Sequence, residues 1–444
     1  MLDMPLDRST MFCVIGAGSS GITAAKNLNE AGIPCEVFER EDGIGGNWYY
    51  GHPASSVCRS THLISSKPLT EYTDFPMPRD YPDFPSHAQV LAYFRDYVTH
   101  FGLERFITFN TEVTLVEPVG ADARQWDVTL RDTRTDATET RRYRGVIICN
   151  GHNWLPKYPT YPGEFTGQVL HSADYKTPDV LEGKRVLVVG AGNSGCDIAA
   201  ESATHARKTF LSTRRGYYYM PKFFFGRPVD QVGERLLDLG VPLGLRRVVG
   251  NITYRVAVGD LGRYGVKRPD HKLFETHPIV NNQLPYYIAH GDVISKPDVQ
   301  RFDGARVTFA DGSVEDDIDL VVYATGFQIV FPFMDRALLN WTRDHPSLYL
   351  NVFHPTYDNL FVVGLIQPDS GQWGLEDRQA RAIARFIAQL DRKSPKAERF
   401  RRLKTAGQEN YGGGVHYKES TRHYVEVEHH SYRRRLDAAA AQLA

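Results

Sequence analysis

The chain has 444 residues, 42% of them hydrophobic, which is enough for about three domains with sizeable apolar cores. Its 52 Lys and Arg residues are balanced by 53 Asp and Glu residues, for a formal net charge of −1. This balance excludes a strongly basic nucleic-acid binder and an acidic disordered chain.

Residues 11–40 predict a strand, a glycine turn, a helix and a second strand. The apolar residues 11–15 lead into the turn GAGSSG at residues 16–21, and Gly32 ends the Ala-rich helix that follows. In a GxGxxG turn the first glycine permits the tight bend, the second lets backbone N–H groups approach a pyrophosphate, and the third lets the helix pack on its strand. The second strand, residues 35–38, ends at Glu39, whose carboxylate can accept hydrogen bonds from a ribose diol. The unit therefore predicts a site for an unphosphorylated adenosine ribose, as in FAD.

Residues 184–215 repeat this scheme. Residues 186–189 predict a strand, GAGNSG occupies residues 190–195, and residues 209–211 predict the second strand. The position that corresponds to Glu39 is Thr213, followed by Arg214 and Arg215, whose guanidinium groups can pair with a 2′-phosphate. Two such turns, each between a strand and a helix, are far more specific than one. The second unit favours NADPH over NADH, although a solvated strand end remains the alternative for the two arginines.

Two further strands, at residues 145–151 and 318–326, indicate where the chain passes between the units. We therefore predict an α/β fold with two Rossmann-like dinucleotide-binding domains, the NADPH domain being inserted in the FAD domain. The expected boundaries are 1–163 for the first part of the FAD domain, 164–324 for the NADPH domain, and 325–444 for the second part of the FAD domain with a C-terminal helical tail. The role of the elaboration at residues 226–295 cannot be inferred from its pattern.

The tail at residues 391–444 contains 12 Lys and Arg residues against 7 Asp and Glu residues and ends in a short helical pattern. A solvated or subunit-contacting helix is the favoured interpretation, ahead of a membrane or nucleic-acid role.

Cysteine spacing and hydropathy narrow the class of protein further. The five cysteines form no CxxC pair and no Cys/His ligand pattern, so no disulfide framework, metal site or dithiol redox centre is expected. No stretch of about 20 apolar residues is present, and the start of the sequence does not resemble a signal peptide. We expect a cytoplasmic protein that binds neither nucleic acid nor membrane.

The segment FTGQVLHSADY at residues 165–175 fits the FxGxxxHxxxY fingerprint of the flavin-containing monooxygenases. GGNW at residues 45–48, STRRG at residues 212–216 and ATGF at residues 324–327 are similar to their counterparts in that family, and the resemblance covers roughly residues 11–390. The related Baeyer–Villiger monooxygenases usually carry Trp where Tyr175 stands here. Tyr175 therefore favours the branch that oxidises heteroatoms.

The resemblance implies an NADPH- and O2-dependent enzyme of the N,N-dimethylaniline monooxygenase type. In that family NADPH reduces FAD, the reduced flavin forms a C4a-hydroperoxide with O2, and one oxygen passes to an amine nitrogen or a sulfide sulfur. The cofactor carries out this chemistry, while the protein positions the reactants and excludes water from the site. No Ser/His/Asp triad is therefore expected. Relatives are frequently dimers, so the resemblance allows a homodimer.

The resemblance also assigns roles to positions of this sequence. The FAD pyrophosphate would lie on Gly16, Ala17, Gly18, Ser19, Ser20 and Gly21, with Glu39 on the ribose and Gly46, Asn47, Trp48 and Ser65 on the flavin side. NADPH would lie on Gly190, Gly192, Asn193, Ser194, Gly195, Ser212, Thr213, Arg214 and Arg215. His171 and Tyr175 fall at the predicted domain crossing, which favours a structural role over catalysis.

One position departs from the family. Relatives carry an Asn that helps to hold NADP+ and the flavin peroxide, and here that position is Ile64, which cannot donate a hydrogen bond. Losing one oriented donor at such a site can cost on the order of 3 kcal/mol of stabilisation. Either His62 or Ser65 supplies the donor, or the peroxide decays to H2O2; a solvent-facing loop histidine is an equally strong interpretation of His62.

Four other functions were weighed against heteroatom oxidation. Tyr175 counts against Baeyer–Villiger oxygenation of a ketone, whereas Ile64 motivates a weakly coupled NADPH oxidase that produces H2O2. Two intact nucleotide turns argue against a regulatory protein without turnover. A pyridine-nucleotide disulfide reductase lacks the CxxC that it would need.

Overall fold

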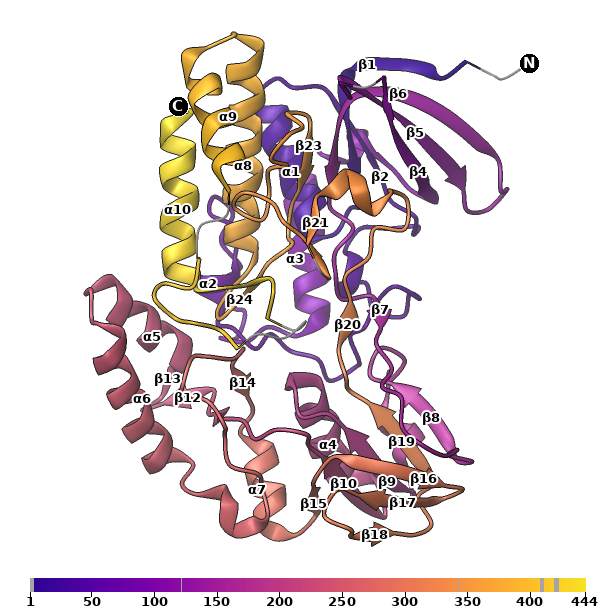
Figure 1. The fold of residues 1–444 in the computed structure, drawn as a ribbon, viewed down its shortest axis with the longest axis vertical. Coiled ribbons are helices and arrows are strands. Elements are labelled where there is room, and N and C mark those ends of the chain that lie inside the picture. The colour runs from indigo at the N-terminus through magenta and orange to yellow at the C-terminus, as the bar shows by residue number, and fades with distance from the viewer. Residues whose placement is uncertain (1–3, 121, 343, 408–410, 419–422) are drawn as a thin grey trace.

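The computed structural model describes residues 4–120, 122–342, 344–407, 411–418 and 423–444. Figure 1 shows two sheet-based units, one above the other in that view, with helices α8, α9 and α10 beside the upper unit and α5 and α6 beside the lower one. This arrangement confirms the predicted α/β fold with two Rossmann-like domains.

The first sheet runs in the order β3-β2-β1-β6-β5-β4, with β23 also paired to β6. β1 lies parallel to β2 and β6, and Val14 near its C-terminal end pairs with Val37 and Ile147, so the apolar strand predicted at residues 11–15 is the buried part of this central strand. The strands are β1 (Leu6–Ile15), β2 (Cys35–Phe38), β3 (Ile107–Thr108), β4 (Thr111–Val119), β5 (Gln125–Asp132), β6 (Thr138–Ile148) and β23 (Leu360–Val362).

The helices of this unit bury their small and apolar residues. Helix α1 carries Ala24, Ala25 and Leu28 into the core and ends before Gly32, whose φ of +69° suits a glycine. The helices and 3-10 turns are α1 (Ser19–Glu30), η1 (Gly46–Trp48), α2 (Lys67–Thr70), α3 (His87–His100), η2 (Glu104–Phe106), η5 (Arg336–Leu339), α8 (Trp373–Asp391), α9 (Pro395–Ala406) and α10 (His429–Gln442). Short strands complete it: β21 (Trp341–Thr342), β22 (His345–Pro346), β24 (Gln367–Pro368) and β25 (Glu426–Val427).

The second sheet is parallel, in the order β15-β10-β9-β19-β8. Its strands are β8 (Gln168–His171), β9 (Arg185–Val189), β10 (Lys208–Ser212), β15 (Val293–Lys296) and β19 (Leu320–Tyr323), all inside the range 164–324. The predicted strand at 318–326 is therefore β19 of this sheet, whereas the one at 145–151 is the end of β6 in the first sheet. The boundaries of the domains stay predictions.

Further elements surround the second sheet. The helices and turns are η3 (Pro178–Leu181), α4 (Asn193–His205), α5 (Val229–Asp238), α6 (Leu243–Ala257), η4 (Leu261–Tyr264) and α7 (Gln283–His290). The short strands are β11 (Tyr219–Met220), β12 (Phe223–Phe224), β13 (Arg227–Pro228), β14 (Ile279–Val280), β16 (Val299–Asp303), β17 (Arg306–Phe309) and β18 (Val314–Glu315). None of the described helices has the length and apolarity that crossing a bilayer requires.

Two short strands carry the chain between the units. β7 (Leu155–Pro156) leaves the first unit, β20 (Phe327–Gln328) returns to it, and the two pair antiparallel. The connection is therefore a two-stranded ribbon rather than two separate linkers.

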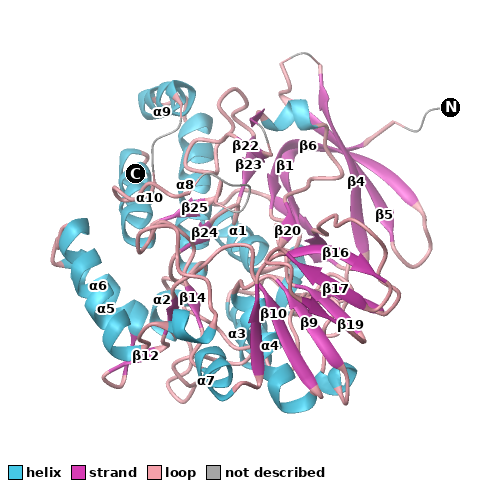
Figure 2. Ribbon diagram, turned by 60° about the horizontal axis from the view of Figure 1, so that its bottom comes forward, coloured by secondary structure: helices cyan, strands magenta, loops and turns pink. Residues whose placement is uncertain are grey.

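The elaboration at 226–295 and the C-terminal tail meet on another side of the molecule. Glu234 on α5 pairs with His429 on α10 (3.2 Å), and Arg246 on α6 pairs with Glu428 (3.5 Å); these four side chains are buried and are called the clasp below. Figure 2 shows α5, α6 and α10 along one edge of the molecule. The clasp gives the elaboration a role that its sequence pattern did not reveal.

The tail helix differs from the sequence-based expectation of a solvated or subunit-contacting helix. Helix α10 forms where the pattern predicted a helix, but it packs against α8 and buries Tyr432, Leu436 and Ala439. Its basic residues occupy the other face. The tail is thus part of the core of the first unit.

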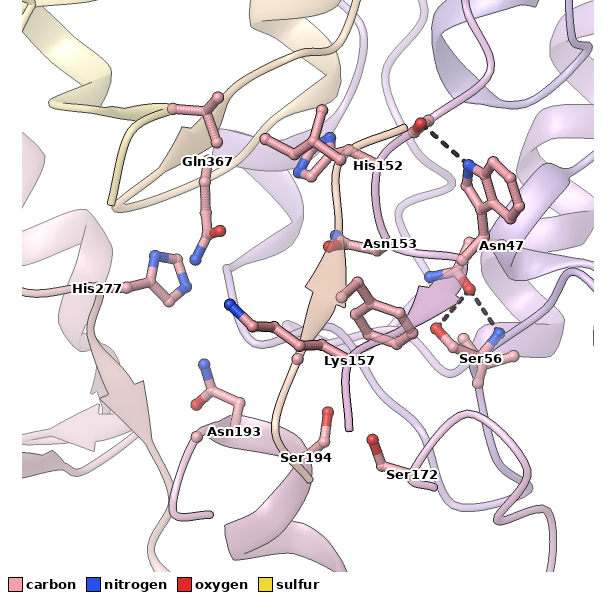
Figure 3. A pocket seen from close by; sticks show the side chains of 18 of the residues that line it. Asn47, Ser56, His152, Asn153, Lys157, Ser172, Asn193, Ser194, His277 and Gln367 are labelled. Carbon is pink, nitrogen blue, oxygen red and sulfur yellow. Dashed lines mark hydrogen bonds between the residues drawn. The ribbon is translucent and has the colours of Figure 1, made fainter. Parts of the chain in front are cut away.

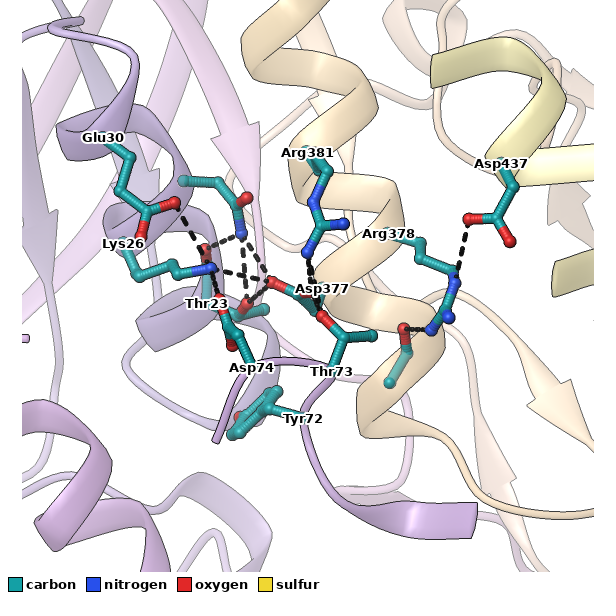
Figure 4. A network of polar contacts seen from close by, with 12 residues as sticks. Thr23, Lys26, Glu30, Tyr72, Thr73, Asp74, Asp377, Arg378, Arg381 and Asp437 are labelled. Atoms are coloured by element: carbon teal, nitrogen blue, oxygen red, sulfur yellow. Dashed lines mark hydrogen bonds and ion pairs between the residues drawn. The ribbon is translucent and has the colours of Figure 1, made fainter. Parts of the chain in front are cut away.

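A buried charge network joins α1 to α8 (Figure 4). Asp377 on α8 is fully buried and accepts hydrogen bonds from Thr23 (3.1 Å) and Asn27 (2.8 Å). The ammonium of Lys26, also buried, lies 3.4 Å from the same carboxylate and pairs with Asp74 as well. Because the pairing of buried charges offsets their desolvation, each partner depends on the other.

We predict that Lys26→Met lowers the free energy of unfolding by about 3–5 kcal/mol, because it leaves the Asp377 carboxylate buried with less compensating charge. Urea denaturation would measure the loss. Arg381→Ala is the matched control, since Arg381 pairs with the same carboxylate from a part-exposed position (2.8 Å) and should cost about 1 kcal/mol or less. Equal losses in the two variants would contradict the prediction.

Candidate active site and dinucleotide sites

One cavity of about 1100 Å³ reaches both glycine turns. Gly16, Gly18, Ser19 and Ser20 line one part of it, and Gly190, Gly192, Asn193 and Ser194 line another. Figure 3 shows Asn193, Ser194 and Lys157 on one side of the hollow and His152, Asn153 and Asn47 on the other. The volume lies slightly above the usual range for ligand pockets, roughly 300–1,000 Å³.

The first turn has room for backbone and none for side chains. A Cβ on Gly21 would lie 1.9 Å from the carbonyl oxygen of Gly16, and one on Gly16 would lie 2.8 Å from that of Cys149. Helix α1 consequently starts directly on the turn, and its N-cap, Gly18, provides no side-chain hydrogen bond for the first N–H groups. Free N–H groups at a helix N-terminus form an anion site, so the turn fits a pyrophosphate.

Glu39 stands at the end of β2 with its carboxylate on the cavity wall. The side chain is buried and accepts hydrogen bonds from the N–H of Ala17 (2.7 Å) and of Glu41 (3.1 Å). Burial raises the pKa of this carboxyl, against the effect of the two N–H donors. An acceptor held in this way fits a ribose diol. Ala17 and Gly21 themselves do not line the cavity.

The second turn repeats the geometry of the first. A Cβ on Gly195 would lie 1.9 Å from the carbonyl oxygen of Gly190, and one on Gly190 would lie 2.5 Å from that of Ala324. The Asn193 side chain accepts from the N–H of Val280 (2.9 Å) and donates to the Pro278 carbonyl (3.1 Å). Asn193 therefore anchors the loop before β14 as well as facing the cavity. Gly195 supports the turn from outside the cavity.

The four residues from Ser212, at the end of β10, to Arg215 do not all line the cavity. Ser212, the last residue of β10, lines the cavity while its hydroxyl donates to the Pro297 carbonyl (2.8 Å), whereas Thr213 is buried and does not line the cavity. Arg214 and Arg215 line it, and Arg215 donates through Nε to Asp270 (3.0 Å). An arginine oriented through Nε presents the rest of its guanidinium to a ligand, which fits a 2′-phosphate.

On the flavin side predicted from the sequence, Gly46 and Asn47 line the cavity. A Cβ on Gly46 would lie 3.1 Å from the Cα of Gly18, which is tighter than an ordinary contact, so glycine at this position lets the two loops approach closely. The amide oxygen of Asn47 accepts from the N–H (2.6 Å) and hydroxyl (2.7 Å) of Ser56. Trp48 meets Trp373 edge to face, with ring centroids 5.9 Å apart.

Ile64 lines the same cavity with a half-buried side chain and provides no donor. Of the two candidate replacements, Ser65 shares a hydrogen bond with Thr70 (2.8 Å between hydroxyl oxygens). His62 is exposed and its Nδ1 lies 2.8 Å from the Ser60 carbonyl, while its ring also borders the cavity. The roles of Ile64, His62 and Ser65 remain predictions.

The domain crossing contains the fingerprint residues. His171, fully buried at the end of β8, lies near the rings of Tyr158 (5.3 Å) and Phe327 (5.4 Å), which belong to the two crossing segments. The Tyr175 hydroxyl donates to Glu201 (2.7 Å). These contacts agree with a structural role for both residues.

Sequence reasoning missed several residues of the cavity wall. His152 and Asn153 follow β6, and Lys157 follows β7 in a Pro-rich stretch at the crossing between the units. Burial lowers the pKa of His152 to about 4, so its imidazole is neutral near pH 7. Glu376, in the first turn of α8, is fully buried and reaches the cavity from the distant C-terminal part of the chain. The only local sequence signal for these wall residues was the polar run GHNW, which directly follows the buried strand.

Comparisons with known proteins agree with this geometry. The model of the flavin-binding monooxygenase-like family matches residues 9–437. The chain is 37% identical to flavin-containing monooxygenase 5 of Oryctolagus cuniculus over 389 residues, 83% of this chain and 71% of the relative. It is 33% identical to dimethylaniline monooxygenase [N-oxide-forming] 2 of Pan troglodytes over 401 residues, 85% of this chain and 73% of the relative. Its fold resembles NADP+-bound cyclohexanone monooxygenase from Rhodococcus sp. Phi1 (TM-score 0.71, 20% identity, covering 99% of this chain and 98% of that one).

We predict that the two glycine turns fail separately. Gly195→Ala should raise the Kd for NADP+ by about tenfold or more while the protein keeps FAD, because the new methyl group must push α4 off its turn. Gly21→Ala should lower the FAD content instead. Flavin absorbance and NADP+ titration would measure the two effects, with Gly233→Ala as a control because its Cβ meets nothing within 4 Å. Loss of FAD from Gly195→Ala would reverse the assignment of the turns.

We also predict that replacing Arg214 and Arg215 with Ala raises the KM for NADPH by about 10- to 100-fold, the effect of lost charge-assisted hydrogen bonds. The KM for NADH should change much less. Steady-state kinetics with both nucleotides would measure this, and Arg207→Ala, on an exposed arginine outside the cavity, is the control. Equal increases for the two nucleotides would mean that these arginines do not recognise the 2′-phosphate.

Proposed function

The chain belongs to the flavin-binding monooxygenase-like family, and from that premise we propose that it uses NADPH and O2 to oxygenate soft nucleophiles, namely amines at nitrogen and sulfides at sulfur. The protein is a flavin-dependent monooxygenase with FAD and NADPH as cofactors. The observation that carries the proposal is the single cavity into which both glycine turns open.

The bound flavin supplies hydride acceptance from NADPH and activation of O2. The overall reaction consumes substrate, O2, NADPH and a proton, and yields the oxide, NADP+ and water. A tertiary amine or a sulfide reacts through its lone pair, so no C–H bond is broken and no general base is required. The residues of this chain therefore need only to bind and orient the cofactors and the substrate and to exclude water.

Residues of the chain divide these tasks among them. The glycine turns and Glu39 would hold FAD, whereas Arg214 and Arg215 would hold the phosphorylated ribose of NADPH. Ile64 and the neutral His152 present uncharged surfaces to the cavity, which suits an unprotonated amine or a sulfide. Two further facts support the substrate class: Tyr175 stands where ketone-oxidising relatives usually have Trp, and a 33% identical relative is named for N-oxide formation.

Product analysis tests the substrate class. We expect N-oxide from N,N-dimethylaniline and sulfoxide from an aryl methyl sulfide, each matched to the NADPH consumed. Lactone from cyclohexanone, without N-oxide or sulfoxide, would instead establish the second candidate, Baeyer–Villiger oxygenation.

A weakly coupled NADPH oxidase is a further candidate, favoured by the apolar side chain of Ile64 on the cavity wall. We predict that Ile64→Asn, which restores an amide donor, lowers the H2O2 released per NADPH consumed by about tenfold or more, since one oriented donor is worth on the order of 3 kcal/mol. Peroxide and NADPH assays with substrate present would measure the ratio.

Ile64→Leu is the matched control for this experiment, because it keeps the volume and adds no donor. If the natural protein already releases little H2O2, His62→Ala and Ser65→Ala identify the residue that replaces the missing amide. Unchanged release in all four variants would show that this part of the wall does not control coupling.

A further inference from the structure

Glu376 is a buried carboxyl at the N-terminal turn of α8, on the wall of the cavity next to the first glycine turn. It is 0% exposed. A Cβ on Gly364 would lie 2.2 Å from the Ser20 hydroxyl and 3.0 Å from Oε1 of Glu376. Only Gly364, which has no side chain, thus separates the Glu376 carboxyl from the turn that fits a pyrophosphate.

This carboxyl has little to stabilise a negative charge. Oε1 accepts one hydrogen bond from the Gln372 amide (2.7 Å), whereas Oε2 has no hydrogen-bond partner among the described residues. The contrast with Asp377, the next residue, is direct. Asp377 is equally buried, but Lys26 and Arg381 pair with it and its pKa is lowered.

The groups that face Glu376 include no cation among the residues described. Ser19 and Ser20 of α1 offer hydroxyls, Tyr72 and Cys149 interact electrostatically with Glu376, and His152 makes its hydrogen bond to the backbone of Gly364. Burial raises the pKa of Glu376 to about 7, because it outweighs the neighbouring amide and hydroxyls, which lower the pKa. At neutral pH the free protein therefore contains both protonation states.

We propose that Glu376 takes up a proton as FAD binds, so that the flavin dinucleotide is held beside a neutral carboxylic acid. The proposal rests on the assignment of FAD to the first glycine turn. A pyrophosphate on that turn brings negative charge next to a buried carboxyl that no cation compensates, and like charges at short range in a poorly solvated site favour the protonated form. Glu376 is a positioning residue whose protonation decides how tightly the cofactor is retained.

The direction of the pH dependence follows from this linkage. Well below pH 7 the carboxyl is already protonated in the free protein, so FAD affinity is constant there. Above that pH the free protein must first gain a proton, and the Kd for FAD rises by up to about tenfold per pH unit. The rise stops once the pH exceeds the pKa of Glu376 in the complex.

The test is calorimetric titration of the full-length apoprotein with FAD, between about pH 6.5 and 9, in pairs of buffers that differ in ionisation enthalpy. We expect uptake of about one proton per FAD near pH 8. Glu376→Gln, which is neutral and of the same shape, should bind FAD with a nearly constant Kd and without proton uptake. Glu71→Gln is the matched control, because this half-buried acid near α2 lies outside the cavity and should leave the uptake unchanged.

Binding of FAD by the natural protein without proton uptake in this range would overturn the proposal, even if Glu376→Gln fails to fold. Uptake that persists in Glu376→Gln would assign the proton to another residue and overturn it equally. A protein that bound no FAD at any pH would contradict the cofactor assignment itself, which is a distinguishable result.

Discussion

The structure depends on two places where a helix begins so close to the preceding turn that a single methyl group does not fit. Gly21 and Gly195 each bring a Cα against the carbonyl of the glycine that opens the turn, Gly16 or Gly190. The N-termini of α1 and α4 are thereby fixed at the carboxyl edges of their sheets. Since both edges open into one cavity, the two sheet-based units share it.

Adjacent acids on α8 show how burial can serve two purposes. Asp377 faces α1 and is neutralised by Lys26, so its charge holds the helix in place. Glu376 faces the cavity and has no such partner among the described residues, so its charge responds to what the cavity contains. A single step along the helix separates a structural carboxyl from a responsive one, because only one of the two faces a cation.

The features that could be predicted from the sequence are those set by residues close together along the chain. Strand–turn–helix units are set by apolar runs, glycines and a strand end within about thirty residues, and β2 and β9 fall within a residue of their expected bounds. The insertion of one Rossmann-like domain in the other was also predicted, and it is confirmed. The places of Ile64 and Arg214 on the cavity wall agree with the expectations for them, and their functional roles await the tests above.

Contacts between distant segments could not be predicted in this way. Glu234 and His429 of the clasp are 195 residues apart, so neither the helical pair at 226–295 nor the packing of α10 had a local signal. Glu376 lies on a helix whose sequence shows amphipathic periodicity but not which of its acids meets a lysine. The packing of whole elements makes that distinction.

Two of the connections between the units differ in kind. The β7–β20 ribbon is short and its strands are hydrogen-bonded to each other, so it bends more easily than it stretches. The clasp joins the same two units elsewhere through side chains alone. Because the clasp side chains are buried, any bending at the ribbon that opened this side of the molecule would have to separate paired charges, so the clasp ties the two units together at a second place.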